Sequence, residues 1–120
     1  MTTAMSSQAI DRKEDLATLK SLWKDVMDDL NRRRGLIGEE IRSYPTPIPR
    51  CDAQFNHLYE QQARLARELD RVGALDEKNL GRGDYFRLIE EFIASAPYTD
   101  DAAERDFRAR CRAELSRAAR

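Results

Sequence analysis

The stretch LATLKSLWKDVMDDL, residues 16–30, decides how this chain folds. Its apolar residues recur at alternating spacings of three and four, at Leu16, Leu19, Trp23, Val26 and Leu30. This is the heptad spacing of a helix that buries one stripe against a neighbouring helix. Leu22 and Met27 widen the stripe, which predicts contact with more than one neighbour. We therefore expect a long helix over residues 8–43, preceded by a frayed N-terminus at residues 1–7.

A glycine interrupts this helix pattern after three arginines. Gly35 between a basic turn and Leu36 is typical of a helix end. The apolar phase nevertheless resumes at Ile37 and Ile41, which favours a continuous helix. We expect one helix with a weak point at Gly35–Gly38, and a stop at Gly35 is the alternative.

The segment SYPTPIPRCD, residues 43–52, holds three of the four prolines and predicts a stiff strut over residues 44–51. A second heptad pattern follows at Phe55, Leu58, Gln62, Leu65, Leu69 and Val72. It predicts a helix over residues 52–72, with Asp52 as its N-cap and Gln62 as a polar residue that fixes register. Two heptad helices joined in this way predict a long antiparallel, coiled-coil-like hairpin, with the strut folded back along the first helix.

Two further helices complete the predicted fold. One spans residues 84–96, with Asp84 as its cap and Pro97 as its stop. The other spans residues 100–119 behind Thr99, with a narrow stripe at Phe107, Cys111, Leu115 and Ala118. The predicted fold class is therefore all-α, a single domain in which two helices pack on the hairpin in a four-helix-type arrangement.

The amino-acid composition of the chain limits the classes of function that we expect for it. Of the 120 residues, 41% are hydrophobic and 36% are charged, which is typical of helices with long solvated faces. The net charge of −1 gives no global attraction to nucleic acid or to anionic lipid. The N-terminus has no apolar leader and no segment is long and apolar enough to span a membrane. We expect a cytoplasmic protein with no membrane contact.

The helix at residues 84–96 is the most hydrophobic segment of the chain. Its apolar residues cover an arc of about 160°, so they must be buried against the hairpin or against a partner. We take five of them as a candidate interaction surface: Tyr85, Phe86, Ile89, Phe92 and Ile93.

The C-terminal helix carries a candidate basic patch of Arg105, Arg108 and Arg112, which suggests nucleic-acid or phosphate binding. Each of three acids nevertheless precedes an arginine by four residues, in the pairs Asp101–Arg105, Glu104–Arg108 and Asp106–Arg110. This is the favourable order for ion pairs on one helix. The spacing therefore favours a solvated, salt-bridged surface over a nucleic-acid interface.

Catalytic and metal-binding patterns are weak in this sequence. The aspartates of DVMDD, residues 25–29, lack the second acidic motif and the large cavity that magnesium–diphosphate chemistry needs. His57 is the sole histidine, and neither Cys51 nor Cys111 belongs to a CxxC motif or has a base nearby in sequence. A disulfide between the two cysteines stays open. We predict no catalytic residue, no metal site and no cofactor.

The leading interpretation is a non-enzymatic helical interaction protein, an adaptor, regulator or assembly factor with an unidentified protein partner. Its excess of heptad surface also favours a homodimer. Nucleic-acid or phosphate binding through the C-terminal arginines is the alternative, disfavoured by the acid–arginine spacing. A small enzyme or ligand-binding bundle built around Cys51 and His57 ranks third.

Overall fold

Helices make up almost all of the chain that the structure describes. The computed structural model describes residues 2–45 and 53–118, with the side chains of residues 15–45 and 53–118. These residues form the α-helices α1 (Thr2–Ser43), α2 (Ala53–Gly73), α3 (Arg82–Ala94) and α4 (Ala102–Ala118), with a 3₁₀ turn, η1 (Glu77–Asn79), before α3. No strand occurs in these described ranges. The prediction of an all-α fold is confirmed.

Helix α1 is the long axis of the molecule. Its 42 residues make a rod of about 63 Å, in a molecule that extends 71 Å in its longest direction. The helix begins at Thr2, so most of the segment predicted to be frayed is helical, and it continues through Gly35 and Gly38. Each glycine costs about 1 kcal/mol relative to alanine in a helix. Burial of Ile37, between the two glycines, offsets that cost.

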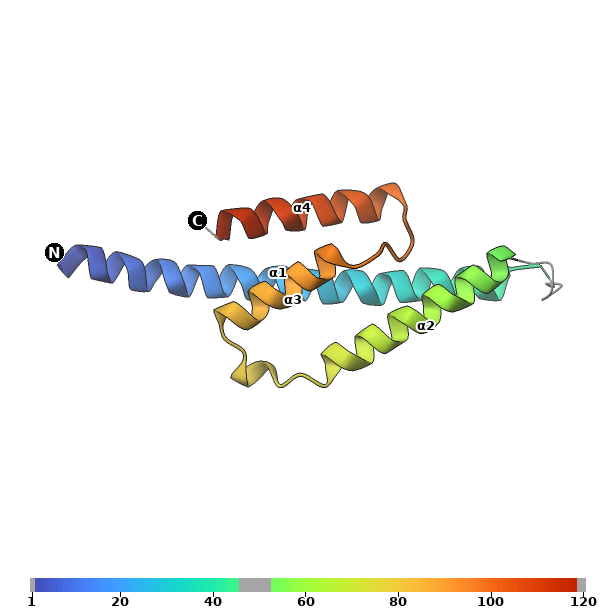
Figure 1. The fold of residues 1–120 in the computed structure, drawn as a ribbon, viewed down its shortest axis with the longest axis horizontal. Helices are drawn as coiled ribbons and strands as arrows, with labels where there is room; N and C mark the ends of the chain where they lie inside the picture. Colours follow the sequence, from blue (N-terminus) through green and yellow to red (C-terminus); the bar gives the residue numbers. More distant parts are fainter. Residues whose placement is uncertain (1, 46–52, 119–120) are drawn as a thin grey trace.

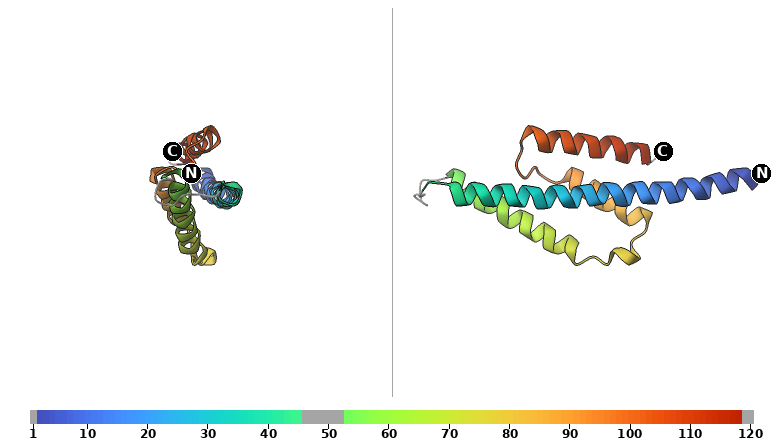
Figure 2. Two further views of the ribbon diagram at one scale, coloured as in Figure 1. Left: turned by 90° about the vertical axis from the view of Figure 1, so that its right-hand side faces the viewer. Right: turned by 180° about the vertical axis from the view of Figure 1, so that it is seen from behind.

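The other three helices all pack on α1, and α3 packs on α4 as well. Helix α2 starts beside the C-terminal end of α1 and runs back along it, diverging from it on the way (Figures 1 and 2). Helix α4 lies on another side of α1 and runs in the same direction as α2 (Figure 1). The structure differs here from the predicted four-helix-type arrangement. Among the described residues, helix α2 does not pack on α4, and α3 packs on both α1 and α4.

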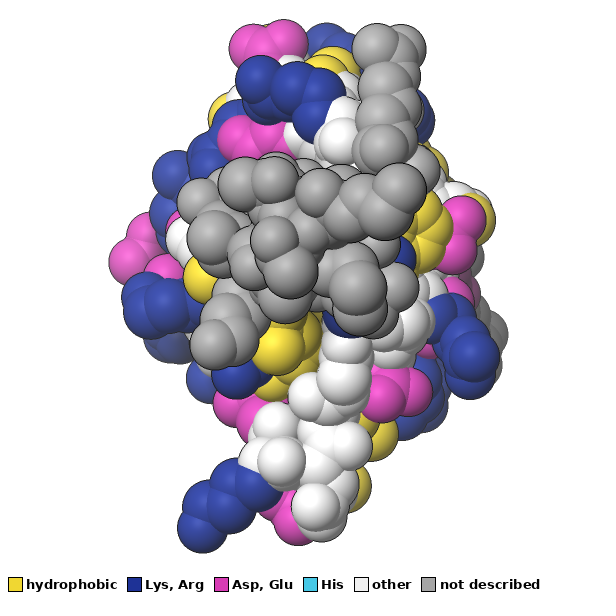
Figure 3. All heavy atoms as spheres, turned by 90° about the vertical axis from the view of Figure 1, so that its left-hand side faces the viewer, with side chains coloured by type: hydrophobic (Ala, Val, Ile, Leu, Met, Phe, Trp, Pro, Cys, Tyr) yellow, Lys and Arg dark blue, Asp and Glu magenta, His cyan; other side chains and the backbone are white. Residues whose placement is uncertain are grey.

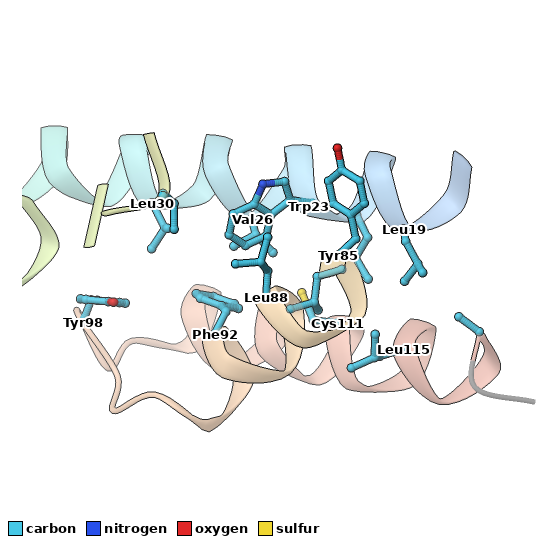
Figure 4. Close-up of a cluster of buried hydrophobic side chains, with 14 of the residues drawn as sticks. Leu19, Trp23, Val26, Leu30, Tyr85, Leu88, Phe92, Tyr98, Cys111 and Leu115 are labelled. Atoms are coloured by element: carbon cyan, nitrogen blue, oxygen red, sulfur yellow. The ribbon is translucent and has the colours of Figure 1, made fainter. Parts of the chain in front are cut away.

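The hydrophobic core lies where α1, α3 and α4 meet (Figure 4). Four of the five stripe residues that the sequence singles out in α1, Leu19, Trp23, Val26 and Leu30, are buried there, and Leu16 is half-buried. The four buried residues face buried residues of α3, α4 and the loop between them: Tyr85, Leu88, Phe92, Tyr98, Cys111 and Leu115. Ile89 of α3 belongs to the same buried cluster. Along α2, Leu65 and Val72 are buried, whereas Leu58, Gln62 and Leu69 are half-buried. Outside α1, most of the buried apolar residues therefore belong to α3, α4 and the loop between them.

Two helix starts differ from the predicted ones. Asp84 lies at the third residue of α3, where its carboxylate accepts the backbone N–H of Gly81 at 2.8 Å. Asp101, and not Thr99, caps α4 by accepting the backbone N–H of Glu104 at 2.8 Å. Both carboxylates satisfy N–H groups that have no partner within a helix.

The proline strut falls largely outside the described residues. Its predicted path over residues 44–51 and the predicted cap at Asp52 are described at Tyr44 and Pro45 alone. The ring of Tyr44 lies 5.2 Å from that of Phe55 at the start of α2, so the two helix ends meet there. In the described part of the chain, none of the helices has a stretch both long and apolar enough to cross a membrane.

Candidate protein-binding surfaces

A buried ionic cluster joins α1 to the start of α4. We use this name for the buried residues Asp29 and Arg33 of α1 and Glu104 and Arg108 of α4, together with Asp101, which is exposed at the edge of the cluster. Glu104 is fully buried, and its carboxylate accepts the backbone N–H groups of Tyr98 at 2.9 Å, Thr99 at 3.0 Å and Asp100 at 2.7 Å. Three consecutive loop amides therefore converge on one side chain, which fixes the path of the loop between α3 and α4.

Arg33 ties this loop to α1. Its guanidinium is 1% exposed and binds Asp29 with two hydrogen bonds of 2.8 and 3.0 Å. The same group donates to the hydroxyl of Thr99 at 2.7 Å and to Asp101 at 3.3 Å. Buried charge is costly unless it is paired and hydrogen-bonded, and Arg33 meets both conditions.

Arg108 closes the other side of the loop. It is 4% exposed and donates to the carbonyls of Phe92 and Ser95 at 2.8 Å each, and to Glu104 at 3.4 Å. Its guanidinium also lies over the ring of Phe92, 4.6 Å from the centroid. Arg108 therefore adds hydrogen bonds to carbonyls at and just after the C-terminal end of α3, where the backbone N–H of Ser95 also reaches the carbonyl of Phe92.

The electrostatics of the cluster keep both α4 carboxylates ionised. Burial would raise the pKa of Glu104, but the N–H groups of Tyr98, Asp100 and Thr99 and the charge of Arg108 outweigh burial and lower it. The pKa of Asp101 is lowered chiefly by the backbone N–H of Glu104, with Thr99 and Arg33 adding to the effect. Carboxylates held in this way are poor proton donors near neutral pH. We read the cluster as structural.

The structure divides the candidate basic patch. Arg105 and Arg112 are exposed, whereas Arg108 points inward and its guanidinium is bound within the buried ionic cluster. Arg105 pairs with Asp100, and Arg110 with Asp25 and Glu114, so these cations already have acidic neighbours. Seen from the N-terminal end of α1, basic and acidic side chains alternate over the surface (Figure 3). Arg108 is therefore withdrawn from any phosphate contact at this surface.

The candidate interaction surface is also divided. Tyr85, Ile89 and Phe92 are buried within the chain, so they serve the core. Phe86 and Ile93 are half-buried and remain accessible. They line a groove of about 370 Å³ between α3 and α4, which we call the α3–α4 groove; its other lining residues are Glu90, Ala94, Arg112, Leu115 and Ser116.

A second, larger groove was not foreseen from the sequence. It lies between α1 and the connection from α2 to α3, has a volume of about 700 Å³, and is called here the lysine groove. Its apolar lining comes from Trp23, Met27, Val72, Leu75 and Tyr85. The charged residues around it are Lys20, Lys24, Glu77 and Lys78, all of them exposed. The divergence of α2 from α1 opens this groove, and divergence cannot be read from a heptad pattern.

The candidate reactive residues are not assembled into a site. Burial raises the pKa of the Cys111 thiol to about 11, so this thiol is a weak nucleophile. His57 is exposed and its ring Nε2 lies 3.4 Å from the Gln61 amide, while Cys51 falls outside the described residues. Within the described ranges, no group of three His, Cys, Asp or Glu side chains is placed to hold a metal ion.

The aspartates of the DVMDD segment are held by cations of the chain itself. Asp28 pairs with Lys24 at 2.9 Å, Asp25 pairs with Arg110, and Asp29 belongs to the buried ionic cluster. These partners compensate the negative charges that would attract a magnesium ion.

No protein-family model, curated protein or solved structure matches this chain. Its function must therefore be argued from the two grooves and the charges around them.

Proposed function

We propose that this chain is a non-catalytic helical interaction protein, an adaptor or assembly factor of the cytoplasm, and that it pairs with a second copy of itself through the α3–α4 groove. The two large accessible apolar side chains in that groove, Phe86 and Ile93 of α3, carry the proposal. The buried Leu115 of α4 forms part of its floor, and the opposite faces of both helices are anchored in the core. A rigid apolar groove with a polar rim is a common feature of protein contact surfaces.

The charges beside the groove favour a second copy as the occupant. Glu90 on α3 and Arg112 on α4 both line it, and neither forms an ion pair with any residue that the structure describes. In a two-fold dimer each subunit uses the same surface, so Glu90 of one copy would face Arg112 of the other. One unpaired acid and one unpaired base on the same groove make that surface self-complementary.

We also infer that α1 and α2 act as an antiparallel helical hairpin that supports these contacts. The proposal is supported by the packing of α2 on α1 and by the ring contact between Tyr44 and Phe55 where the two helices meet. A rod of about 63 Å would give a dimer long exposed helix faces on which further proteins can assemble.

The test is the mass of the full chain in solution, measured by sedimentation equilibrium. We expect a dimer for the natural chain and a monomer for Ile93→Glu, because a charge in the groove would be buried unpaired. Leu36→Glu is the matched control, since Leu36 is a large hydrophobic residue on α1 with 43% of its surface exposed. This control is expected to stay dimeric.

A charge exchange sharpens the test. Glu90→Arg and Arg112→Glu should each weaken the dimer, because each places like charges opposite one another across the two-fold axis. The double exchange should restore it. A natural chain that stays monomeric at millimolar concentration, or a double exchange that restores nothing, would overturn the proposal.

A further inference from the structure

The proposed dimer contact does not cover the lysine groove, with its apolar lining and its lysines. Its accessible apolar lining comes from Met27 and Leu75, above a floor formed by the buried core residues Trp23, Val72 and Tyr85. It shares none of its lining residues with the α3–α4 groove. We propose that the lysine groove binds an acidic amphipathic helix from a protein partner. This inference goes beyond the proposed dimer and does not depend on it.

The distribution of lysine in the chain is the first argument. The sequence contains four lysines, and three of them, Lys20, Lys24 and Lys78, line this one groove. Elsewhere the described cations in ion pairs are arginines, at Arg32, Arg33, Arg71, Arg82, Arg105, Arg108 and Arg110. Arginine suits fixed two-pronged pairing, whereas lysine is a flexible point charge that meets a carboxylate without a set geometry.

The pairing state of these lysines is the second argument. Lys20 and Lys78 form no side-chain ion pair with any described residue, and Lys24 pairs with Asp28 at the surface. Glu77 also lines the groove, and Asp28 already compensates Lys24. Lys20 and Lys78 against Glu77 therefore leave an excess of one positive charge. An occupant with acidic side chains on its flanks would complement this excess of positive charge.

The shape of the groove favours a helix over other occupants. The groove runs along α1 from Lys20 to Met27, a length of about 10 Å, and has a volume of about 700 Å³, so it accommodates roughly two turns of a helix that is about 10–12 Å wide with its side chains. Leucine-type side chains at spacings of three and four would reach the apolar lining together. A flat bilayer would not reach the bottom of a concave groove, and nucleic acid would leave its apolar lining uncovered.

The test is a peptide selection on the full chain. Random 16-residue peptides displayed on phage are selected on the natural protein and counter-selected on the double variant Lys20→Glu/Lys78→Glu. Both lysines are exposed and unpaired within the described residues, so the variant should keep its fold. We expect enriched peptides with net negative charge and apolar residues at positions i, i+3 or i+4, and i+7.

The affinity of the strongest peptide, made synthetically, then decides the inference. We expect binding to the natural chain at least about tenfold tighter than to Lys20→Glu/Lys78→Glu, with affinity that falls as salt rises. Arg34→Glu/Arg87→Glu is the matched control, because it changes the net charge equally at two exposed arginines outside both grooves. This control should lose less than about threefold. Ile93→Glu should bind the peptide as the natural chain does.

Amide chemical shifts of the full chain locate the peptide. Shifts over residues 20–27 and 72–78 are expected on binding. The inference is overturned if the selected peptides are neutral or basic, if both charge variants bind equally, or if the shifts map to the α3–α4 groove. It is also overturned if phosphatidylglycerol vesicles bind the chain through Lys20 and Lys78 and no acidic helical peptide is selected. None of these results bears on the mass of the dimer, so the two proposals fail separately.

Discussion

Two connections of similar length join the last three helices. Charged side chains from neighbouring helices hold one of them, whereas the charged side chains of the other are exposed. The α3–α4 loop, residues 95–101, is held from three helices: Arg33 and Arg64 reach it from α1 and α2, and Glu104 and Arg108 reach it from α4. The α2–α3 connection, residues 74–81, is held by Leu75 and Leu80, which pack against the core, by short-range backbone hydrogen bonds, and by the side chain of its own Asp76. That side chain accepts the backbone N–H of Lys78 at 3.2 Å and the amide of Asn79 at 2.7 Å.

The difference shows which charged side chains stabilise the fold and which ones do not. Around the α3–α4 loop the charges of Arg33, Glu104 and Arg108 are buried and paired, so removal of one leaves its partners uncompensated. Along the α2–α3 connection Glu77 and Lys78 are exposed and contribute little to the folded state. Charges of the first kind specify the fold, and charges of the second kind remain available to a partner. Four substitutions or conditions test this distinction.

The largest effect is expected from Glu104→Gln. The substitution removes the charge that Arg108 faces and places an amide NH₂ against the N–H groups of Tyr98, Thr99 and Asp100. We expect the free energy of unfolding, measured in urea, to fall by about 3–5 kcal/mol. Glu77→Gln in the other connection is the matched control and should change it by less than about 0.5 kcal/mol. A loss below about 1 kcal/mol for Glu104→Gln would contradict the distinction.

Acid should destabilise the natural chain through the same carboxylates. The pKa values of Glu104 and Asp101 are lowered in the folded state, so the unfolded chain takes up protons first as the pH falls. Stability is therefore full above the ordinary carboxyl range near about 4 and is lost as the pH drops through the lowered values. Each carboxyl contributes a slope of at most about 1.4 kcal/mol per pH unit. Urea titrations should show a shallower acid slope for Glu104→Gln, and equal slopes would contradict this role.

A smaller effect is expected at the outer edge of the loop. Arg64 donates to the carbonyls of Ala96 and Pro97 and lies 3.9 Å from the centroid of the Tyr98 ring. Arg64→Ala should lower the free energy of unfolding by about 1–2 kcal/mol. Arg67→Ala, an exposed arginine one turn further along α2, should cost less than about 0.5 kcal/mol. Equal losses at the two arginines would show that the contact with the loop contributes nothing.

The smallest effect is expected at the lysine groove. Lys20→Ala and Lys78→Ala should each change the free energy of unfolding by less than about 0.5 kcal/mol, because neither side chain is paired with a described residue. Thermal and urea unfolding can both be used for this measurement. A loss above about 1 kcal/mol would mean that these lysines serve the fold and are not kept for a partner.

The heptad spacing in α1 predicted the buried residues Leu19, Trp23, Val26 and Leu30 correctly, because burial of apolar area selects one helix face. The Asp29–Arg33 and Glu104–Arg108 pairs follow the i,i+4 spacing seen in the sequence. Their burial was missed, because that spacing is the same on a solvated face and on a buried one.

A signal for the buried ionic cluster did exist. Arg33 lies between Leu30 and Ile37 in the phase of the α1 stripe, and all three are buried. The α4 stripe, extended backward from Leu115 and Cys111 by three and four residues, reaches Arg108 and Glu104. Charged residues in phase with an apolar stripe could therefore have been taken as buried partners. The sequence contains no comparable signal for the lysine groove, because the groove depends on the angle between α1 and α2 and on residues that are distant in sequence.

Hydrogen exchange of backbone amides in the free, full-length chain tests the distinction between the two connections most directly. The amides of Tyr98, Thr99 and Asp100 donate to buried Glu104, so they should exchange as slowly as the core of α4. Amides of residues 74–81 should exchange at least about a hundredfold faster, because little buried structure protects them. Fast exchange at all three loop amides, or equal protection of both connections, would contradict the assignment of one to the fold and the other to recognition.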